Sequence, residues 1–402
     1  MRIVFVTDTF HKEMGYLENC LPPHLAMQGH EVHIISSPLP PYYYLGSSES
    51  ILGKFAEASR LTPDTNEDYD GCILHVLPAG MFLRRVYLKG LAQKLKELKP
   101  DVVQIGTPIG AIALTTALAR SIVRFALFTG NHQGFSTFPL ARRRLPWYHP
   151  EILKTWAARG AHGRFIGSLT ERCYAVTADC GEVAWRFFGV PKRKLEVVHL
   201  GSDTRYFHPV RSQEDADSRN QLRSEFGFAP NEIVCIFTGK MDEFRNPLLL
   251  ARVVTDLRAH GNPFQALFVG TGSQRQEIES LGFRVLDFMS FRELGKFYRS
   301  ADLGVWPGPE SISQLDAAGC GLPLIVGDVG HYREHLNGNG IIYKTGDQAD
   351  LMRAIIGMQD RETRLRLGQS GANKIAKEFS WKSIADRRLA DYNSAISTKR
   401  RM

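Results

Sequence analysis

The chain has 402 residues, of which 43% are hydrophobic and 23% are charged, a composition typical of globular proteins. This length exceeds what one hydrophobic core usually supports, so we expect two domains of roughly 200 residues each. No apolar run approaches the ~20 residues that a membrane-spanning helix needs. The first residues, MRIVFVTD, lack a signal-peptide layout, and we therefore expect a cytoplasmic protein.

The cysteines and the net charge further limit the classes of protein and of binding partner that are compatible with the sequence. Six cysteines are scattered along the chain without a CxxC pair, which favours buried reduced thiols over a disulfide framework or a zinc site. The net charge of +8 is compatible with nucleic acid, an anionic membrane surface or phosphorylated ligands. Nucleic acid is disfavoured because the sequence contains no groove-reading helix and no aromatic RNA-binding platform.

The first half alternates short apolar runs with helical stretches. The strand-like runs span residues 2–8, 30–36, 101–106, 125–130 and 173–178. Strands that alternate with helices predict parallel β-α-β units in a doubly wound sheet. The second half repeats this pattern, with strand-like runs at 233–239, 264–270, 283–288, 302–307 and 322–328.

We therefore predict an α/β protein with two doubly wound Rossmann-like domains that face each other across a cleft. The domains are expected at 1–203 and 221–378, joined by a polar linker over 204–220. The tail, 379–402, is predicted to form an amphipathic helix that crosses back to the first domain. Ligands of such sheets bind at the carboxyl ends of the strands.

Two stretches follow strand ends in the second half. In PGPESISQLDAAGCGLP, the segment 308–314 leads from a strand into a small-residue helix, whose free N–H groups favour an anion. Asp316 in the first helical turn and Glu310 before it are two nearby acids. In FTGKMDEFRN, Lys240 and Arg245 stand in another such loop, where two cations suit a diphosphate. Solvated loop residues are the alternative interpretation for both stretches.

These stretches resemble motifs of the retaining glycosyltransferases of family 4, which have the GT-B fold. TGKMDEFRN is similar to the family pattern Gly-Arg-x-x-x-x-Lys-Gly, with Lys240 and Arg245 at the two basic positions. LDAAGCGLPLIVGD resembles the block Leu-Glu-Ala-Met-Ala-Cys-Gly-x-Pro-Val-Ile, with Asp316 in place of its glutamate. The family has a second glutamate eight residues earlier, where this chain has Gly308, so Glu310 matches that glutamate by role and not by register.

The resemblance implies a nucleotide-diphosphate sugar as donor and roles for particular residues. The diphosphate would contact Lys240 and Arg245, and the ribose would contact Asp316. The other implied contacts are Glu310 with the N–H groups of Ser311, Ile312 and Ser313 for the sugar and phosphate, Phe288 and Met289 for the base, Gly15 for the diphosphate, and His132 for the sugar. The resemblance also implies front-side displacement without a metal, and no cofactor beyond the donor.

We expect a hexosyltransferase that acts on a lipid-linked or envelope saccharide at the cytoplasmic membrane face. Two basic segments with interleaved aromatic residues, 81–99 and 140–150, favour contact with anionic lipid headgroups. The alternative interpretation is a solvated helix face whose apolar side packs on the sheet.

Two other functions remain open at this stage. A nucleotide-sugar 2-epimerase uses the same architecture, but it needs first-domain acids and a second histidine that we do not place. A catalytically silent scaffold or binding protein of the same fold would explain Gly308 and the single Gly15 in the first loop. Two Asp-x-Asp triplets, at 68–70 and 215–217, are expected in polar loops and are not predicted to bind a metal.

Overall fold

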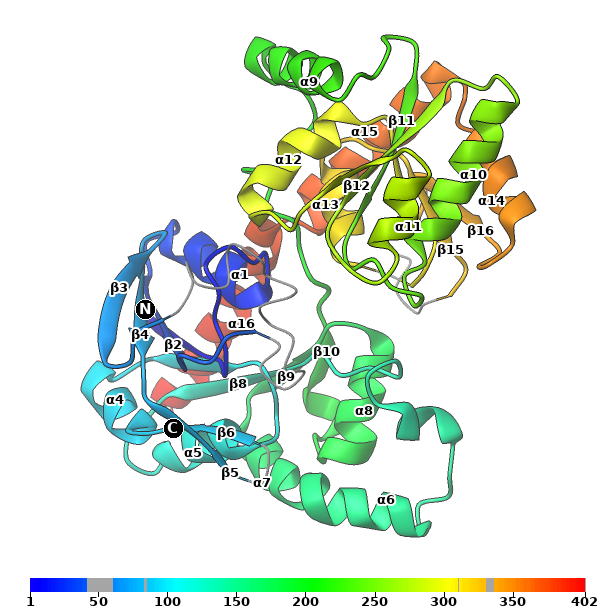
Figure 1. Cartoon of the computed structure of the whole chain (residues 1–402). Coiled ribbons are helices and arrows are strands. Elements are labelled where there is room, and N and C mark those ends of the chain that lie inside the picture. The colour runs from blue at the N-terminus through cyan, green and yellow to red at the C-terminus, as the bar shows by residue number, and fades with distance from the viewer. Residues whose placement is uncertain (42–60, 83–84, 310, 330–335, 402) are drawn as a thin grey trace.

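The computed structural model describes residues 1–41, 61–82, 85–309, 311–329 and 336–401. It contains two α/β domains, each built on a largely parallel sheet (Figure 1). The expectation of two doubly wound domains is therefore confirmed.

The first domain is built on an eight-stranded sheet of order β10-β9-β8-β7-β1-β2-β4-β3. Its neighbouring strands are parallel except for the hairpin of β3 and β4 at one edge. The strands are β1 (Arg2–Val6), β2 (Glu31–Ser36), β3 (Thr65–Tyr69), β4 (Cys72–Val76), β7 (Val102–Ile105), β8 (Ala126–Asn131), β9 (Arg172–Ala175) and β10 (Leu195–Val197). The helices are α1 (Leu17–Ala26), α4 (Leu91–Leu98), α5 (Ala111–Ala119), α6 (Pro150–Thr155), α7 (Ala161–Leu169) and α8 (Ala178–Phe188).

The second domain has a six-stranded, fully parallel sheet of order β13-β12-β11-β14-β15-β16. The strands are β11 (Ile233–Thr238), β12 (Phe264–Val269), β13 (Arg284–Leu286), β14 (Leu303–Trp306), β15 (Leu324–Gly327) and β16 (Gly340–Tyr343). The helices are α9 (Gln213–Glu225), α10 (Pro247–Ala259), α11 (Arg275–Ser280), α12 (Phe291–Ser300), α13 (Ser313–Gly319), α14 (Gln348–Ile356) and α15 (Arg361–Glu378).

The central strands of the second sheet end level with one another. All six residues of β11 pair in register with β12, from Ile233 opposite Phe264 to Thr238 opposite Val269. Every residue of β11 is buried, as expected for a strand that is covered on both faces. The loops after β11, β12 and β14 therefore leave the sheet along one edge, where the predicted donor residues are found.

The predicted linker is only partly a linker. Residues 204–220 include the first part of α9, whose N-cap is Ser212, and the Ser212 hydroxyl accepts a hydrogen bond from Asp215 N at 3.1 Å. The helix is anchored on the second domain because Arg223 donates to Asp302 at 3.0 Å. The prediction of a linker across this whole range was wrong because a polar helix that is held by ion pairs resembles a loop in composition.

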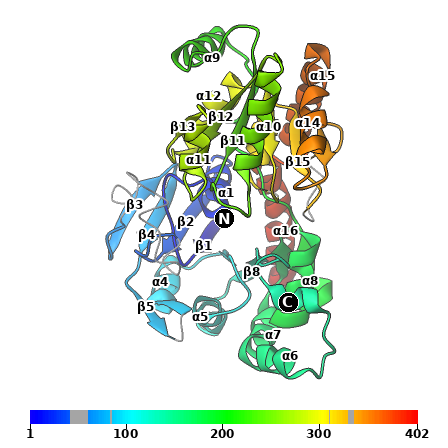
Figure 2. The same ribbon diagram turned by 45° about the vertical axis from the view of Figure 1, so that its right-hand side comes forward.

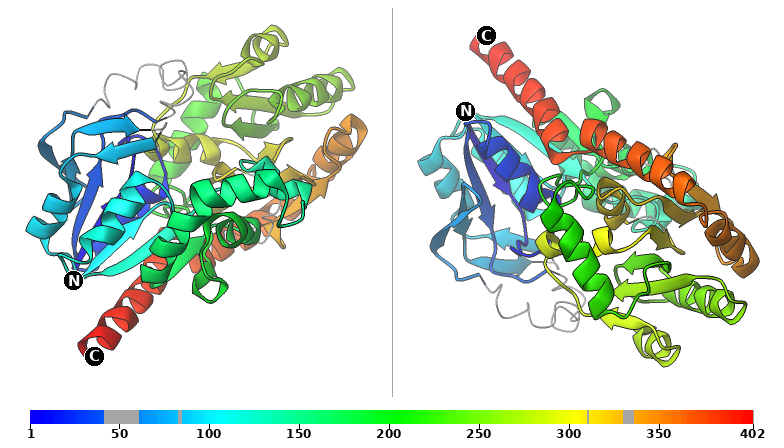
Figure 3. Two further views of the ribbon diagram at one scale, coloured as in Figure 1. Left: turned by 90° about the horizontal axis from the view of Figure 1, so that it is seen from below. Right: turned by 90° about the horizontal axis from the view of Figure 1, so that it is seen from above.

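The last helix, α16 (Trp381–Arg401), runs from the second domain along the first, as Figures 2 and 3 show. Its start is fixed by Ser202, which donates its backbone N–H to Phe379 O at 2.8 Å and accepts from Trp381 N at 3.1 Å. Farther along, Asp391 accepts a hydrogen bond from the Tyr174 hydroxyl at 2.7 Å. The helix thereby brings side chains from the C-terminal end of the sequence into the first domain.

Three local expectations are revised. Within 81–99 the chain forms the hairpin of β5 (Ala79–Phe82) and β6 (Arg85–Leu88), then α4; Val86, Leu88, Leu91 and Leu95 are buried in the first-domain core. Neither Asp-x-Asp triplet is wholly in a loop: Asp68 belongs to β3, and 215–217 belongs to α9. Asp70 forms an ion pair at 2.7 Å with Arg292 of the second domain.

Candidate active site

The loop after β11 presents the two predicted cations. The Lys240 side chain is 53% exposed, and its ammonium group lies 3.4 Å from an Asp242 carboxylate oxygen. Asp242 also fixes the loop, because its Oδ1 accepts a hydrogen bond from Arg245 N at 3.0 Å. One carboxylate therefore holds the loop and pairs with one of its cations, so a diphosphate at Lys240 would compete with Asp242.

The loop after β14 lies directly against the loop of the two cations. A Cβ atom at Gly308 would come within 2.5 Å of Phe244 O and 2.7 Å of Arg245 Cα, so this position has no room for a side chain. Gly308 is the position where the family pattern has its other glutamate, eight residues before the one that Asp316 replaces. In this chain the close approach of the two loops leaves room only for glycine there.

The glycine-rich loop after β12 packs on the same segment. A Cβ at Gly272 would lie 2.2 Å from Met241 O, and Met241 N donates to Thr271 O at 2.9 Å. The glycines of this loop, Gly270 and Gly272, thus allow the close contact between neighbouring loops.

The helix tip of α13 is fixed by hydroxyl groups. The Ser313 hydroxyl donates to Thr238 O at 3.3 Å and lies 2.8 Å from the Ser311 hydroxyl. Trp306 donates its indole N–H to Thr238 O at 3.0 Å. These contacts tie the end of β11 to β14 and to the start of α13. The N-cap residue of α13, Ile312, is partly exposed. Glu310 lies outside the described residues.

Asp316 is directed toward the chain crossing between the domains. Its Oδ1 accepts a hydrogen bond from the Ser202 hydroxyl at 2.7 Å. Burial, together with the nearby negative charge of Asp203, raises the pKa of Asp316 to about 8. At neutral pH this carboxyl group is therefore largely protonated, and it can donate as well as accept a hydrogen bond.

The predicted base-side residues follow β13. Phe288 and Met289 are partly buried, and Ser290 caps α12 by accepting from Arg292 N at 3.4 Å. Gly15 of the first domain meets this segment, because a Cβ there would lie 3.2 Å from the Phe291 Cβ. Glu13 O also accepts a hydrogen bond from Phe291 N at 3.2 Å. Gly15 thus allows close approach to α12.

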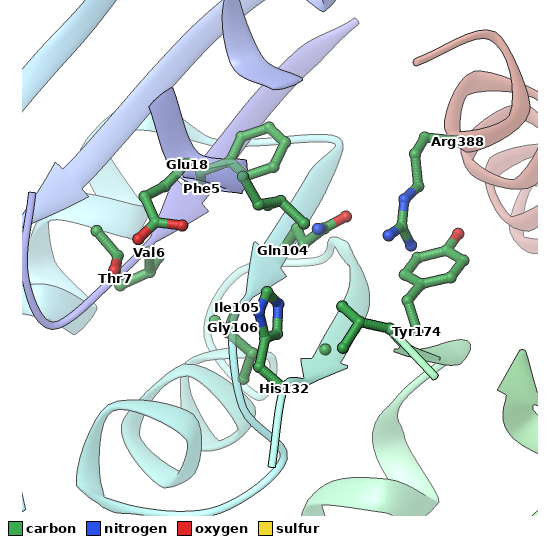
Figure 4. A pocket seen from close by; sticks show the side chains of 13 residues that line it. Phe5, Val6, Thr7, Glu18, Gln104, Ile105, Gly106, His132, Tyr174 and Arg388 are labelled. Carbon is green, nitrogen blue, oxygen red and sulfur yellow. The ribbon is translucent and has the colours of Figure 1, made fainter. Parts of the chain in front are cut away.

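His132 follows β8 and lines a cleft at the carboxyl ends of the first-domain strands (Figure 4). The preceding residue, Asn131, fixes the loop by donating to Cys180 O at 2.7 Å. Solvent reaches His132 through the cleft, yet the protein atoms around it and the charge of Arg388 lower the pKa of His132 to about 4. The imidazole is therefore neutral at physiological pH.

The cleft also contains residues that the sequence analysis missed. Arg388 of α16 lines its inner end, and Glu18 and Gln104 line its walls. Burial raises the pKa of Glu18 to about 7. A single sequence gives no signal for Arg388, because a cation in an amphipathic helix is typical of an exposed face. Glu18 is in the first turn of α1, where an acidic residue is equally typical of an exposed helix start, so the sequence gives no signal for it either.

The described residues contain neither a metal-binding cluster nor a helix able to cross a membrane. Among residues 1–41, 61–82, 85–309, 311–329 and 336–401, no cluster of three or more His, Cys, Asp or Glu side chains is arranged to bind a metal ion. Over the same ranges, no helix combines the length and apolar character that crossing a bilayer requires.

Family models match both domains. Residues 22–206 match the model described as Glycosyltransferase Family 4, and residues 232–360 match the model described as Glycosyl transferases group 1. The two matched segments together span most of the chain and agree with the GT-B fold of two parallel-sheet domains. The chain belongs to the group 1 glycosyltransferases of family 4.

Individual relatives are distant. A D-inositol 3-phosphate glycosyltransferase of Rhodococcus erythropolis is 27% identical over 266 residues, which span 60% of this chain and 57% of that protein. Among solved structures, Anabaena Alr3699/HepE in complex with UDP aligns with a TM-score of 0.68 at 15% identity, covering 98% of this chain and all of that one. A glycosyltransferase from Rickettsia africae gives a TM-score of 0.67 at 14% identity, with 98% of both chains covered.

Proposed function

We propose that this protein transfers a hexosyl group from a nucleotide-diphosphate sugar to a lipid-linked or envelope saccharide, without a metal and with retention of anomeric configuration. The observation that carries the proposal is the contact between the loops after β11 and β14, where Gly308 packs on Phe244 and Arg245. This contact gathers Lys240, Arg245 and the tip of α13 at one edge of the sheet. Cations and free N–H groups in that arrangement suit a diphosphate.

The chemistry follows from this arrangement. In the transfer, the bond from the sugar C1 to the phosphate oxygen breaks, and a bond from C1 to the acceptor oxygen forms on the same face. The proton of the acceptor hydroxyl passes to the leaving diphosphate, so no protein base is required. Lys240 and Arg245 stabilise the charge that develops on the diphosphate, a preorganised electrostatic contribution. Ser311, Ile312 and Ser313 supply backbone contacts, and Asp316 contacts the ribose.

The remaining predicted residues complete the donor site in this proposal. Phe288 and Met289 border the base, Gly15 approaches from the first domain, and the neutral His132 faces the sugar. Glu310 would contact the sugar, although its position is outside the described residues. UDP is the first nucleotide to test because it is named in the HepE structure.

The proposal is tested by product analysis with UDP-, GDP- and ADP-sugars, each with and without a membrane-lipid extract as acceptor source. The proposal predicts release of nucleoside diphosphate together with an acceptor product whose anomeric configuration equals that of the donor. Conversion of the donor sugar without acceptor would instead identify an epimerase. Neither transfer nor donor hydrolysis above background with any donor would favour the silent binding protein.

The proposal places the acceptor at a membrane, and one surface supports this. Residues 142–148 expose Arg142 and Arg144 together with Trp147, which is 78% exposed, and Tyr148, which is 63% exposed. Aromatic rings beside arginines suit an anionic lipid interface. We name these residues the basic aromatic segment.

Membrane contact is tested by sedimentation with vesicles. The protein should bind phosphatidylglycerol vesicles more strongly than phosphatidylcholine vesicles, and the double substitution Trp147→Ser and Tyr148→Ser should reduce this binding several-fold. Trp185→Ser is the matched control, because Trp185 is 41% exposed but lies against Lys192 outside the basic aromatic segment. Equal binding by the double variant would contradict the assignment of this surface.

A further inference from the structure

Arg388 is a buried arginine without a charged partner. It is 2% exposed, and neither its Nε nor its Nη1 has a hydrogen-bond partner among the described residues. Within the same residues, no ion pair involves Arg388. Its guanidinium carbon lies 3.1 Å from the centroid of the Tyr174 ring, so one face is covered by the aromatic ring. A buried cation in this state lacks the charge compensation that buried charges normally have.

The carboxylates near Arg388 are already engaged. Asp391 accepts a hydrogen bond from the Tyr174 hydroxyl at 2.7 Å and lies 3.4 Å from Arg172. Glu196 pairs with Arg387 at 2.7 Å on the outer face of α16. The neighbouring Tyr392 donates its hydroxyl hydrogen to Gln104 Oε1. Among the described residues, the surrounding side chains therefore form hydrogen bonds and ion pairs with one another and none with the guanidinium group.

The guanidinium faces a small chamber. Figure 4 shows the guanidinium group of Arg388 above the Tyr174 ring, and both residues line the chamber together with Gln104 and His132. The chamber has a volume of about 30 Å³ and continues into the larger cleft of about 360 Å³, with which it shares Thr7, Glu18 and His132. The chamber is too small for a sugar ring, but a terminal oxyanion can enter it.

We propose that this chamber binds an oxyanion, a phosphate or carboxylate group, through the guanidinium group of Arg388. The acceptor carries this group, because the chamber continues into the cleft that His132 lines. A guanidinium group usually binds such groups through two of its N–H donors. Glu18 on the opposite wall is compatible with an anion when it is protonated, and burial raises its pKa to about 7. The acceptor assignment rests on the proposed function, in which His132 faces the sugar that is transferred.

The first test is thermal unfolding at constant ionic strength, with chloride replaced by inorganic phosphate or acetate. Either anion should raise the melting temperature of the wild type by about 2–4 °C at roughly 10–100 times its dissociation constant. Arg388→Met should abolish this rise and should not lower the melting temperature without the anion, because it removes an unpaired charge. Arg387→Met, the same change on the exposed neighbour, should keep the rise. An equal rise in Arg388→Met would overturn the proposal.

A second measurement does not depend on the folding of a variant. A crystal of the wild type soaked in selenate, a tetrahedral oxyanion, should show an anomalous peak beside the guanidinium group of Arg388. A water molecule alone at this position would overturn the proposal.

The source of the anion is tested with glucose 6-phosphate and glucose. If the acceptor carries the oxyanion, glucose 6-phosphate should raise the melting temperature of the wild type but not of Arg388→Met. Glucose, which lacks the phosphate, should have no effect on either protein. A rise with inorganic phosphate only would overturn the acceptor assignment and identify a site for free anions.

Results that contradict the anion-binding proposal can be distinguished from results that contradict the proposed donor site. UDP should stabilise the wild type and Arg388→Met alike, and the double substitution Lys240→Ala and Arg245→Ala should lose the UDP effect but keep the phosphate effect. No stabilisation of the wild type by UDP would count against the proposed function, whereas loss of the phosphate effect in the double variant would place the anion at the donor site and overturn the chamber proposal.

Discussion

The Ser202 hydroxyl donates a hydrogen bond to Asp316 at 2.7 Å, and the same residue forms backbone hydrogen bonds on either side of Ser380, with Phe379 O and Trp381 N. One serine therefore connects the segment that leaves the first domain, the start of α16 and the helix of the proposed donor site. A movement of the domains about this point would change the hydrogen bond between Ser202 and Asp316. Nucleotide binding at Asp316 would in turn change the contacts of Ser202 at the junction between the domains.

Asp316 should make the stability of the protein depend on pH. Its pKa in the folded protein is about 8, against an ordinary value of 3.8, so the folded state binds more protons between these values. The free energy of unfolding should therefore fall as pH rises from about 4 to about 8. Asp316→Asn should remove about 2 kcal/mol of this decline, less than the full difference in pKa would give, because solvent reaches part of the side chain. Urea unfolding across this range measures it, and Ser202→Ala, which keeps the carboxyl group, is the control. Identical pH profiles for the wild type and Asp316→Asn would contradict the assignment.

Gly308→Ala should disturb the loop of the two cations. The new Cβ would lie 2.5 Å from Phe244 O, so the loops after β11 and β14 must separate. We expect a loss of about 1–3 kcal/mol in the free energy of unfolding and UDP binding about tenfold weaker. Calorimetry and urea unfolding measure both effects. Gly106→Ala is the matched control, because its Cβ would meet no atom within 4 Å. Unchanged UDP affinity in Gly308→Ala would show that this loop contact does not shape the donor site.

The ion pair of Arg292 and Asp70 should couple the two domains. Arg292 is in α12 of the second domain, Asp70 follows β3 of the first, and Arg292 also donates to the Tyr206 hydroxyl at 2.5 Å. A double-mutant cycle with Arg292→Met and Asp70→Asn should give a coupling energy of about 0.5–1.5 kcal/mol in unfolding by urea. Arg252 and Glu277, an exposed pair at 2.6 Å within the second domain, provide the control cycle with a smaller coupling. A coupling energy of zero for Arg292 and Asp70 would mean that the pair does not hold the domains together.

His132 should remain neutral down to unusually low pH. The crowded cleft and the charge of Arg388 lower the pKa of His132 to about 4, so its NMR resonances should not shift between pH 8 and about 5.5. The folded state then binds fewer protons than the unfolded state below about pH 6.5, and the contribution of His132 to stability should decrease as pH falls toward 4. Arg388→Met should move the titration of His132 to higher pH. A midpoint near that of free histidine in the wild type would contradict this description of the cleft.

The sequence predicted the sheets well because their central strands are nearly continuous apolar runs. Residues 233–239 and 264–270 match β11 (Ile233–Thr238) and β12 (Phe264–Val269) almost residue for residue. The hairpin of β3 and β4 was missed because β3 has the polar sequence TNEDY and lies at the sheet edge. For α9, the spacing Ser212-x-x-Asp215 was an available capping signal inside the predicted linker.

The candidate site was predictable only where it follows local patterns. Loop residues such as Lys240 and Arg245 come directly after a buried strand, so the sequence places them at the sheet edge. Arg388 has no such pattern, since its burial depends on the return of α16 to the first domain. The contact of Gly308 with Phe244 and Arg245 likewise depends on two loops meeting across neighbouring strands, a tertiary relationship that one sequence does not reveal.

Calorimetric titration of UDP tests the central claim most directly, with the wild type and with the double substitution Lys240→Ala and Arg245→Ala. The control variant replaces two exposed cations outside this loop, one in α14 and one in α16, by Arg353→Ala and Lys382→Ala. The account predicts that the wild type and the control bind UDP with equal affinity and that the double variant binds at least tenfold more weakly. Equal affinity in all three proteins would contradict the assignment of these cations to the diphosphate.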